Sequence, residues 1–301
     1  MIFSFCWGFS LSVLICFVLI FWQKKRAIAQ PIYALSPKSH HHKKTATLGG
    51  LAFLMSMGAY MLLFTDLVSQ AVILFVFLTA FCFGALGFLD DALALFKQQN
   101  KGLSSKQKLL LQIIVALALM VFYGRYIQPV SLSFFALSVF VLVGSSNACN
   151  LTDGLDGLLA GLSLISLVAF FLLFLGSGWL LLQPVIIVLI GGLCGFLCFN
   201  YYPARLFMGD TGSLALGGIF ASLVIVYQNP FVLVALGAPF ILETVCVMLQ
   251  VGYYKLTKKR LFLMAPFHHH LELMGLKEPF VVAAFLIFHS VIVTLYLYLL
   301  N

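Results

Sequence analysis

Long apolar runs separated by short polar connections dominate this sequence. Runs of roughly 17–25 mainly apolar residues are long enough to cross the hydrocarbon core of a bilayer as helices. Such runs lie near residues 2–22, 48–65, 69–89, 107–124, 131–147, 158–176, 179–199, 212–228, 230–253 and 279–300. The first run lacks a basic leading segment and a small-residue cleavage site, so it is interpreted as a retained helix rather than a signal peptide. The pattern predicts an all-α polytopic membrane protein with ten transmembrane helices in a single integral-membrane domain over residues 1–301.

The composition agrees with this pattern. Hydrophobic residues make up 63% of the chain and charged residues 9%, with a mean hydropathy of +1.11. A water-soluble domain of this size could not bury so much apolar surface. The seven cysteines lie in or beside apolar runs without a Cys-x-x-Cys pair, which is typical of small buried hydrophobic residues.

The basic residues are confined to alternate connections between the runs. Every Lys and Arg except Arg125 lies on one side, in the set of connections at 24–44, 97–108, 147–156, 200–210 and 254–278. Basic loops face the cytoplasm, so both termini are expected to be extracytoplasmic. The net charge of +8 is then a determinant of topology that can also contact the headgroups of membrane lipids, and we expect no nucleic-acid partner.

Carboxylates gather on the same predicted side. Only Asp66 lies opposite, whereas Glu243 lies within the ninth run. That run also contains Pro239, which removes a backbone donor and predicts a break in the ninth helix. Glu243, one turn later, is interpreted either as a functional carboxylate or as a partner for the backbone groups freed at the break.

Two polar segments offer oxygen ligands. Asn150, Asp153 and Asp156 are spaced by three, so one helical turn would align them on one face, and Gly154 and Gly157 would let a ligand approach the backbone. Such oxygen ligands suit Mg²⁺, which favours one or two carboxylates together with substrate phosphates.

In the second segment, Asp210 follows Gly209 at the start of an apolar run. Thr211 and Ser213 come next and are expected to cap the coming helix.

Asp90 and Asp91 end the third run. Adjacent residues of a helix point about 100° apart, so the two carboxylates are expected to have different roles rather than to share one metal ion. The loop that follows carries Lys101, Lys106 and Lys108, which could contact phosphate oxygens, although topology alone also accounts for these lysines.

Two histidine triplets lie in the basic connections, at 40–42 and 268–270. Three consecutive His side chains diverge in direction, which disfavours structural zinc. For His268, His269 and His270, hydrogen bonding or proton transfer beside a diphosphate fits better, whereas the first triplet is interpreted as part of a solvated loop.

Carboxylates, lysines, imidazoles and Gly-rich loops on one membrane face indicate phosphoryl transfer on a lipid headgroup. The sequence has no Walker-type or Rossmann fingerprint, so an ATP-driven machine is not supported. A membrane transporter or lipid flippase is the alternative from another class. Transporters, however, place polar residues near the bilayer midplane in repeated halves, whereas these residues cluster at one face.

Specific motifs resemble a known family. They are Phe88-Leu-Asp-Asp91, Asn100-Lys-Gly-Leu-Ser104, Asn147 to Gly157, Phe207-Met-Gly-Asp-Thr-Gly-Ser213, Glu243 to Tyr253 and Ala265-Pro-Phe-His-His-His-Leu-Glu272. The chain resembles the phospho-N-acetylmuramoyl-pentapeptide transferase (MraY) family, part of the polyprenyl-phosphate N-acetylhexosamine-1-phosphate transferase superfamily. The resemblance covers nearly the whole chain.

The resemblance implies a multi-pass enzyme of the bacterial cytoplasmic (inner) membrane with its active site facing the cytoplasm, and with a homodimer as one expected assembly. It implies Mg²⁺-dependent transfer of phospho-MurNAc-pentapeptide from UDP-MurNAc-pentapeptide to undecaprenyl phosphate, giving lipid I and UMP. This is the first membrane step of peptidoglycan synthesis, which serves cell wall biogenesis and cell shape. The alternative within the superfamily is a GlcNAc-1-phosphate transferase.

Matching the motifs position by position carries roles to individual residues. Asp210 resembles the Mg²⁺-binding aspartate, with Asp153 as a second metal-binding candidate. Asp90 resembles the base that deprotonates the lipid phosphate, with Asp91 beside it and Lys106 as the basic partner of the aspartates. His268 resembles a catalytic imidazole. Direct attack by the lipid phosphate is preferred to a covalent aspartyl intermediate.

The remaining matches imply contacts with the substrate. Phe207 resembles the ring that stacks on uracil, and either Lys43 or Lys44 takes the place of the family's loop lysine, with Lys44 chosen here. The full set of substrate-binding candidates is Lys44, Thr47, Asn150, Asp153, Gly154, Leu155, Asp156, Asn200, Phe207, Gln250, His269 and His270.

Overall fold

The structure is a computed structural model that describes residues 1–25, 45–66, 70–97, 102–176 and 178–300. Within these residues it is helical, and β-structure is limited to an isolated parallel bridge between Ala46 and Leu206. The prediction of an all-α chain is confirmed for this part of the protein. The helices are α1 (Ile2–Lys25), α2 (Gly50–Phe64), α3 (Ala71–Lys97), α4 (Ser105–Tyr126), α5 (Leu132–Thr152), α6 (Leu158–Gly176), the 3₁₀ turn η2 (Leu180–Leu182), α7 (Gln183–Asn200), α8 (Gly209–Val226), α9 (Val232–Leu236), α10 (Ala238–Thr257), α11 (Phe267–Leu273) and α12 (Glu278–Leu300).

Eight segments of the described chain are long and apolar enough to cross a membrane. They are α1, α3, α4, α5, α6, η2 with α7, α8 and α12. The other two predicted spans differ: α2 is apolar but has 15 residues, and the ninth run is divided into α9 and α10 at Gly237. This division lies two residues before Pro239, in agreement with the predicted break. The count of ten spans and the extracytoplasmic placement of both termini stay predictions.

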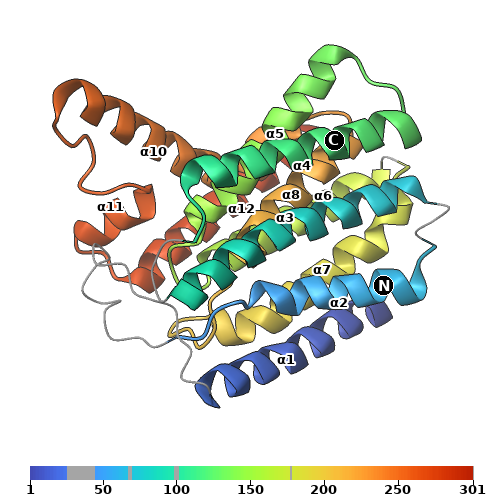
Figure 1. Ribbon diagram of the computed structural model, residues 1–301, viewed down its shortest axis with the longest axis horizontal. Helices are drawn as coiled ribbons and strands as arrows, with labels where there is room; N and C mark the ends of the chain where they lie inside the picture. The colour runs from blue at the N-terminus through green and yellow to red at the C-terminus, as the bar shows by residue number, and fades with distance from the viewer. Residues whose placement is uncertain (26–44, 67–69, 98–101, 177, 301) are drawn as a thin grey trace.

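Helix α8 forms the centre of the bundle, and 17 of its residues, all except Asp210, are buried (Figure 1). It packs against α3 on one side and α5 on another. Gly217 allows a close approach to α5, because a Cβ there would lie 2.2 Å from the Ser145 carbonyl oxygen. Helices in lipid associate through close packing rather than through a hydrophobic driving force. A glycine at position 217 therefore lets α8 pack closely against α5.

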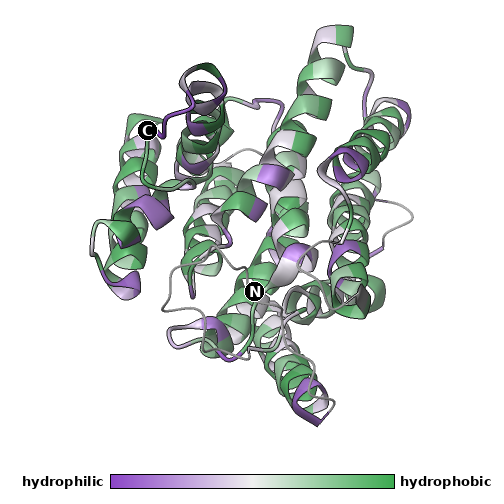
Figure 2. Cartoon of the chain, turned by 60° about the vertical axis from the view of Figure 1, so that its left-hand side comes forward, coloured by the Kyte–Doolittle hydropathy of each residue, from purple (hydrophilic) through white to green (hydrophobic). Residues whose placement is uncertain are grey.

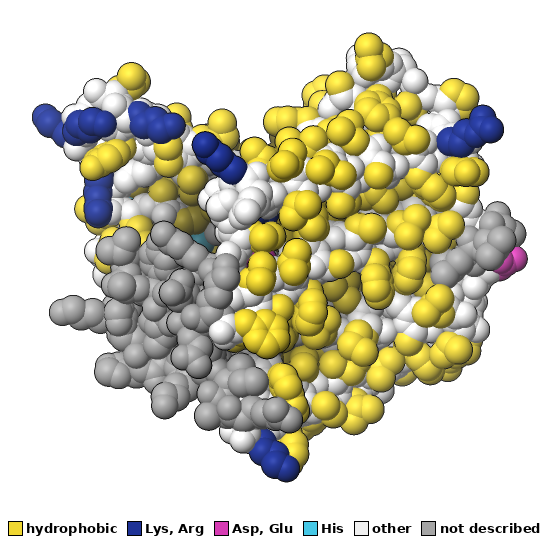
Figure 3. Space-filling model, in the orientation of Figure 1, with side chains coloured by type: hydrophobic (Ala, Val, Ile, Leu, Met, Phe, Trp, Pro, Cys, Tyr) yellow, Lys and Arg dark blue, Asp and Glu magenta, His cyan; other side chains and the backbone are white. Residues whose placement is uncertain are grey.

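The outer surface is apolar. Hydrophobic residues run along most of each helix, and they cover much of the described part of the face in the space-filling view, where Lys and Arg lie mainly at the edges (Figures 2 and 3). Long exposed side chains such as Leu14, Phe140 and Ile287 would be costly in water. The exterior therefore suits a lipid environment.

Helix α10 projects from the bundle, with α11 beside it (Figure 1). Its buried residues, Pro239, Phe240, Glu243 and Cys246, all lie in its first half, and the later residues are largely exposed. Glu243 is the one carboxylate of this helix, and it lies inside the protein. Its partners connect α10 to the functional site.

Candidate active site

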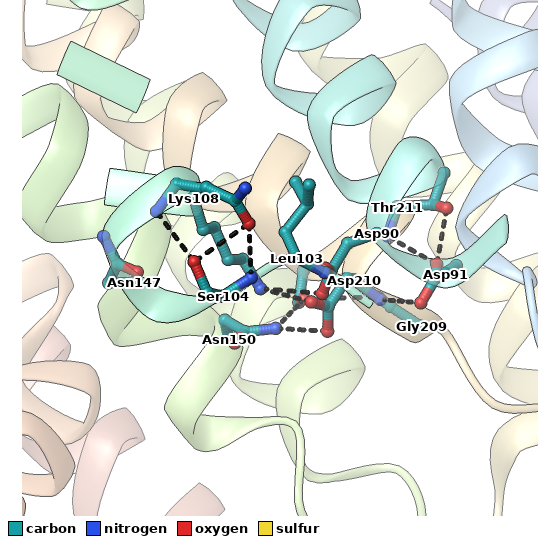
Figure 4. A network of polar contacts seen from close by, with 12 residues as sticks. Asp90, Asp91, Leu103, Ser104, Lys108, Asn147, Asn150, Gly209, Asp210 and Thr211 are labelled. Carbon is teal, nitrogen blue, oxygen red and sulfur yellow. Dashed lines mark hydrogen bonds and ion pairs between the residues drawn. The ribbon is translucent and has the colours of Figure 1, made fainter. Parts of the chain in front are cut away.

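Asp90 and Asp210 lie side by side, joined by a lysine (Figure 4). Asp90 is in the last part of α3 and Asp210 in the first turn of α8. The Lys108 ammonium forms an ion pair with both, at 3.4 Å from Asp90 Oδ2 and in direct contact with Asp210 Oδ2. All three side chains retain some exposure, between 15% and 25%. A lysine between two carboxylates offsets their mutual repulsion and leaves a polar, partly accessible cluster at a helix end.

The remaining oxygens of the two carboxylates also have partners. The Leu103 amide donates to Asp90 Oδ1 at 2.5 Å, and the Asn150 side-chain amide donates to Asp210 Oδ1 at 2.7 Å. The same Asn150 amide reaches Ser213 Oγ at 3.0 Å. The site is therefore assembled from the ends of α3, α4, α5 and α8.

Asp91 anchors the start of α8. Its carboxylate accepts hydrogen bonds from the Asp210 amide (3.0 Å), the Thr211 amide (2.9 Å) and the Thr211 hydroxyl (2.6 Å). These are free amides of a helix N-terminus, where a negative charge is also favoured by the helix dipole. The expectation that Thr211 and Ser213 cap this helix is wrong: both lie inside α8, and the capping carboxylate comes from α3. Asp91 thus positions Asp210.

Two glycines permit this close contact of α3 with the start of α8. A Cβ on Gly87 would lie 2.0 Å from the Asp210 carbonyl oxygen. Gly209 has a φ of +73°, and a Cβ there would lie 2.6 Å from Asp91 Oδ2. A larger residue at either position would push the helices apart.

Lys108, and not Lys106, contacts the aspartates. Helix α4 begins with a capping box in which Ser104 and Gln107 exchange hydrogen bonds. Lys108 lies four residues before the buried Gln112, so the two side chains share a helix face. Lys106 lies two residues earlier, about 200° around the helix, and is exposed. The predicted contact of Lys106 with the aspartates is therefore corrected. The buried residues of α4 lie at 112, 116, 119, 120 and 123. Position 108 continues this face toward the N-terminus, which favours Lys108 as the lysine that contacts the aspartates.

The segment from Asn150 to Asp156 does not form one face. Helix α5 ends at Thr152, and Asp153 occupies its C-cap, so the chain turns before Asp156. Asp156 is buried, and its carboxylate accepts from the Ala204 amide at 2.8 Å, while its own amide donates to Glu278 at 2.7 Å. The predicted alignment is therefore wrong because the helix ends within the motif. Asp156 braces the loop after α7, and Leu155 beside it is buried.

Asp153 remains near the site. Burial, followed by repulsion from Asp210, Asp91 and Asp156, raises the pKa of Asp153 from its ordinary value of 3.8 to about 8. A carboxyl group in this position is protonated at neutral pH unless a cation compensates its charge. A cation close to these carboxylates would relieve their repulsion.

The donor chemistry fits Mg²⁺. Within the described ranges, no three His, Cys, Asp or Glu residues are arranged as a ready-made metal site. Mg²⁺ does not require such a group, because it commonly uses one or two carboxylates and completes its shell with water and substrate phosphates. Asp210 and Asp153 repel each other, and they could supply the two carboxylates of such a Mg²⁺ site.

The loop after α7 is held by a second set of contacts. Asn200 is buried; its side chain accepts from the Gly157 amide at 3.1 Å and donates to the Leu206 carbonyl at 3.0 Å. Phe207 is partly exposed, and both of its backbone groups bond at 2.8 Å to the segment before α2, the amide to Ala46 and the carbonyl to Gly49. Thr47 belongs to that segment, while Lys44 lies outside the described residues. Asn200 thus braces this loop, whereas Phe207 retains partial exposure.

Glu243 fixes the second histidine triplet. Its carboxylate accepts from the amides of Phe267 (2.5 Å) and His268 (3.2 Å), and it lies 3.1 Å from His268 Nδ1. Of the two roles considered for Glu243, satisfying backbone groups is supported, but the groups belong to α11 rather than to the break at Gly237. Since the carboxylate is an acceptor, His268 carries its proton on Nδ1 and presents an unprotonated Nε2.

His268 Nε2 is directed at the end of α5. It is buried without a hydrogen-bond partner, and it would lie 2.2 Å from a Cβ on Gly154. Gly154 therefore admits the imidazole, rather than a ligand, to its backbone. Burial lowers the pKa of His268 below 6.5, against the opposing effect of Glu243, which favours the neutral ring. His268 and Asp153 thus flank the same turn.

The other members of this region hold the chain around α11. His269 Nδ1 lies 2.8 Å from Glu272, His270 Nδ1 accepts from the Leu263 amide at 3.2 Å, and Gln250 binds the backbone of Leu261 and Phe262. In this arrangement His270 and Gln250 shape the loop between α10 and α11. His269 retains partial exposure.

The sequence of the chain places it among known proteins. A family model described as Glycosyl transferase family 4 matches residues 73–228. The phospho-N-acetylmuramoyl-pentapeptide-transferase of Bacillus subtilis (strain 168) is 40% identical, with 94% of this chain and 93% of the relative covered. Proteins of the same name from Staphylococcus epidermidis (strain ATCC 35984) and Staphylococcus aureus (strain RF122) are 43% and 42% identical, with 89% of each chain covered. The predicted resemblance is confirmed, and the chain belongs to glycosyl transferase family 4 and, within it, to the phospho-N-acetylmuramoyl-pentapeptide transferase family.

Proposed function

We propose that this protein transfers phospho-MurNAc-pentapeptide from UDP-MurNAc-pentapeptide to undecaprenyl phosphate, giving lipid I and UMP for peptidoglycan synthesis. The observation that carries the proposal is the similarity to phospho-N-acetylmuramoyl-pentapeptide-transferases, which are about 40% identical over most of the chain. The cluster of Asp90, Asp210 and Lys108 at the end of the bundle supplies a chemical reason. We place this end at the cytoplasmic face, in accordance with the distribution of basic residues in the sequence.

In the proposed reaction, Asp90 takes the proton of the undecaprenyl phosphate hydroxyl. The freed oxygen attacks the phosphorus that carries the sugar, forming a new P–O bond as the bond to the bridging oxygen breaks and UMP leaves. Lys108 holds Asp90 beside Asp210 and offers its ammonium to the phosphate oxygens. Phosphoryl transfer needs chiefly such positioning and charge neutralisation. No covalent intermediate is needed.

A bound Mg²⁺ ion would neutralise negative charge on the diphosphate. We propose Asp210 as its main protein ligand and Asp153 as a second. Asn150 would then keep Asp210 oriented through its 2.7 Å hydrogen bond. His268, whose buried Nε2 packs against Gly154, would hold the turn that carries Asp153.

An apolar cavity provides a place for the lipid chain of the acceptor. It has a volume of about 330 Å³ and lies between α5, α8, α9 and α10. Its lining includes Phe220 and Phe240, and on α5 it includes Ala148 and Cys149, the two residues that precede Asn150. A prenyl chain in this cavity would enter next to the polar cluster.

The protein's assembly as a homodimer stays a prediction.

Formation of the lipid product tests the proposal. The purified protein is incubated with labelled UDP-MurNAc-pentapeptide, with and without undecaprenyl phosphate, and the label is followed into the lipid fraction. We expect a lipid-linked product only when both substrates are present. Label that stays water-soluble in the complete mixture would contradict the proposed function.

Replacing Phe207 by Ala should chiefly weaken binding of the nucleotide sugar. Loss of one base–aromatic stack is worth about 1–3 kcal/mol, so we expect the KM for UDP-MurNAc-pentapeptide to rise about 5- to 160-fold with kcat little changed. Phe288→Ala, on an exposed part of α12, is the matched control. An unchanged KM in the Phe207 variant would remove the stacking role.

The apparent affinity for Mg²⁺ should rise with pH. With the pKa of Asp153 raised to about 8, a cation must displace a proton at lower pH, and this requirement disappears above pH 8. We expect up to about tenfold tighter Mg²⁺ binding per pH unit between pH 6.5 and 8, followed by a plateau. Mg²⁺ titrations of UMP release at several pH values measure this. Asp153→Asn should flatten the dependence, and equal slopes in both proteins would contradict the assignment.

A further inference from the structure

Gln23 is a buried amide at the end of the first helix, and it takes no part in the proposed reaction. It lies in the last turn of α1, a helix that is otherwise almost wholly apolar, and its side chain is fully buried. A polar side chain in such a position is retained only when its hydrogen bonds are satisfied. Its partners are both backbone groups of one residue, Thr47.

The geometry of the pair is that of a neighbouring β-strand. Gln23 Nε2 donates to the Thr47 carbonyl at 2.7 Å, and the Thr47 amide donates to Gln23 Oε1 at 2.9 Å. In extended chain the amide and carbonyl of one residue point to the same side, and those of the next residue point to the opposite side. A carboxamide offers one donor and one acceptor in a plane, so it can replace a strand on that side.

The opposite side of the same segment holds the loop that carries the site. Ala46 pairs with Leu206 in the parallel bridge and accepts from the Phe207 amide at 2.8 Å. The amides of Gly49 and Gly50 donate to the carbonyls of Phe207 and Met208 at 2.8 and 2.9 Å. The segment 45–50 is therefore clamped between Gln23 and residues 206–208. Asp210 follows two residues later.

Thr47 also lies close to Gly209, the first residue of α8. Its hydroxyl is buried without a hydrogen-bond partner, and it would lie 3.2 Å from a Cβ on Gly209, the position that also approaches Asp91. A shift of Thr47 would therefore be felt at Gly209 as well as at Phe207. The position of Thr47 therefore affects residues 206–210, the segment that carries Phe207 and Asp210.

From these contacts we infer that Gln23 is a positioning residue for the nucleotide sugar, acting through the 45–50 segment on Phe207. The inference rests on the proposed function for the identity of the ligand. Gln23 touches no reacting atom, and its effect is to keep the segment in register. Loss of its two hydrogen bonds leaves a buried amide and a buried carbonyl unsatisfied, which the segment can relieve only by moving.

Gln23→Leu removes both hydrogen bonds at similar size. We expect the KM for UDP-MurNAc-pentapeptide to rise about tenfold, while the KM for undecaprenyl phosphate stays within about twofold, because the acceptor cavity lies between other helices. Ser4→Ala is the matched control: it removes a buried hydrogen bond from α1 to Tyr60 of α2, away from the segment. Equal changes in the two KM values, or no change in either, would overturn the inference.

Gln23→Glu separates a positioning role from a general loss of stability. A protonated glutamic acid reproduces the donor and acceptor of glutamine, whereas a carboxylate repels the Thr47 carbonyl. We expect the ratio of variant to wild-type affinity for UDP, measured by direct titration, to recover as the pH falls from 8 to 5.5. A ratio that does not change with pH would contradict the inference. This test does not require that the Gln23→Leu variant folds.

Hydrogen exchange distinguishes failure of this inference from failure of the proposed function. In substrate-free protein, Gln23→Leu should accelerate exchange in peptides that cover 45–50 and 206–210, with peptides of α6 unchanged. Unchanged protection of both segments would refute the positioning role whatever the enzyme's substrate is. Accelerated exchange without UMP formation by the wild-type protein would instead refute the proposed function alone.

Discussion

Replacing Asp210 by Asn should abolish UMP release while the protein still folds in the membrane. Asn has the same shape and can still bond to Asn150, but it lacks the charge that pairs with Lys108 and that would hold a cation. Removing a preorganised charged group of this kind typically costs on the order of 10³-fold or more in kcat. UMP release under saturating substrates measures the effect.

Two controls accompany this variant. Asp66→Asn changes an aspartate on the other predicted side of the membrane and should leave turnover unchanged. Thermal unfolding in detergent should show that Asp210→Asn remains folded. Near-normal turnover of folded Asp210→Asn protein would remove Asp210 from the reaction, and with it the proposed metal site.

Lys108 and Lys106 form a matched pair for the second experiment. Lys108→Met should lower kcat by on the order of 10²-fold, because the two carboxylates it bridges would repel each other and a cation would be lost from the phosphate site. Lys106→Met should stay within about twofold of the wild type, because that side chain is exposed and faces away. A larger loss in the Lys106 variant would show that the sequence-based choice was correct and that the α4 register described here does not hold in the active enzyme.

The charge pattern of the sequence predicted which polar residues belong together. Asp90, Asp91, Asn150, Asp153 and Asp210 were assigned to one face because basic residues mark alternate connections, and the hydrogen bonds between them agree with that grouping. The helical character of the chain and the interruption near Pro239 were equally predictable, since length, hydropathy and proline are local signals.

The errors arise where a contact between distant segments decides the local structure. Spacing by three suggested a common face for Asn150 and Asp156, but α5 ends between them and Asp156 turns to the Ala204 amide. Thr211 follows the usual pattern of a cap, yet Asp91 from another helix takes that role. No local pattern could reveal that Glu243 would bond the first amides of α11, which lies more than twenty residues later.

Several residues that are predicted to contact the substrate also brace the protein. Asn200 and Gln250 have their side-chain groups bonded to backbone in neighbouring loops. Such braces determine where Phe207 and the histidine triplet lie, so their replacement is expected to affect binding through position. Gln23 extends this principle to the first helix, far from the site in sequence.

The most direct test of the account is UMP release by purified protein supplied with undecaprenyl phosphate and either UDP-MurNAc-pentapeptide or UDP-GlcNAc, each with and without Mg²⁺. The account predicts UMP release with UDP-MurNAc-pentapeptide and Mg²⁺, and little release when Mg²⁺ is removed or when UDP-GlcNAc is the donor. Preferential turnover of UDP-GlcNAc, or UMP release that does not depend on Mg²⁺, would contradict it.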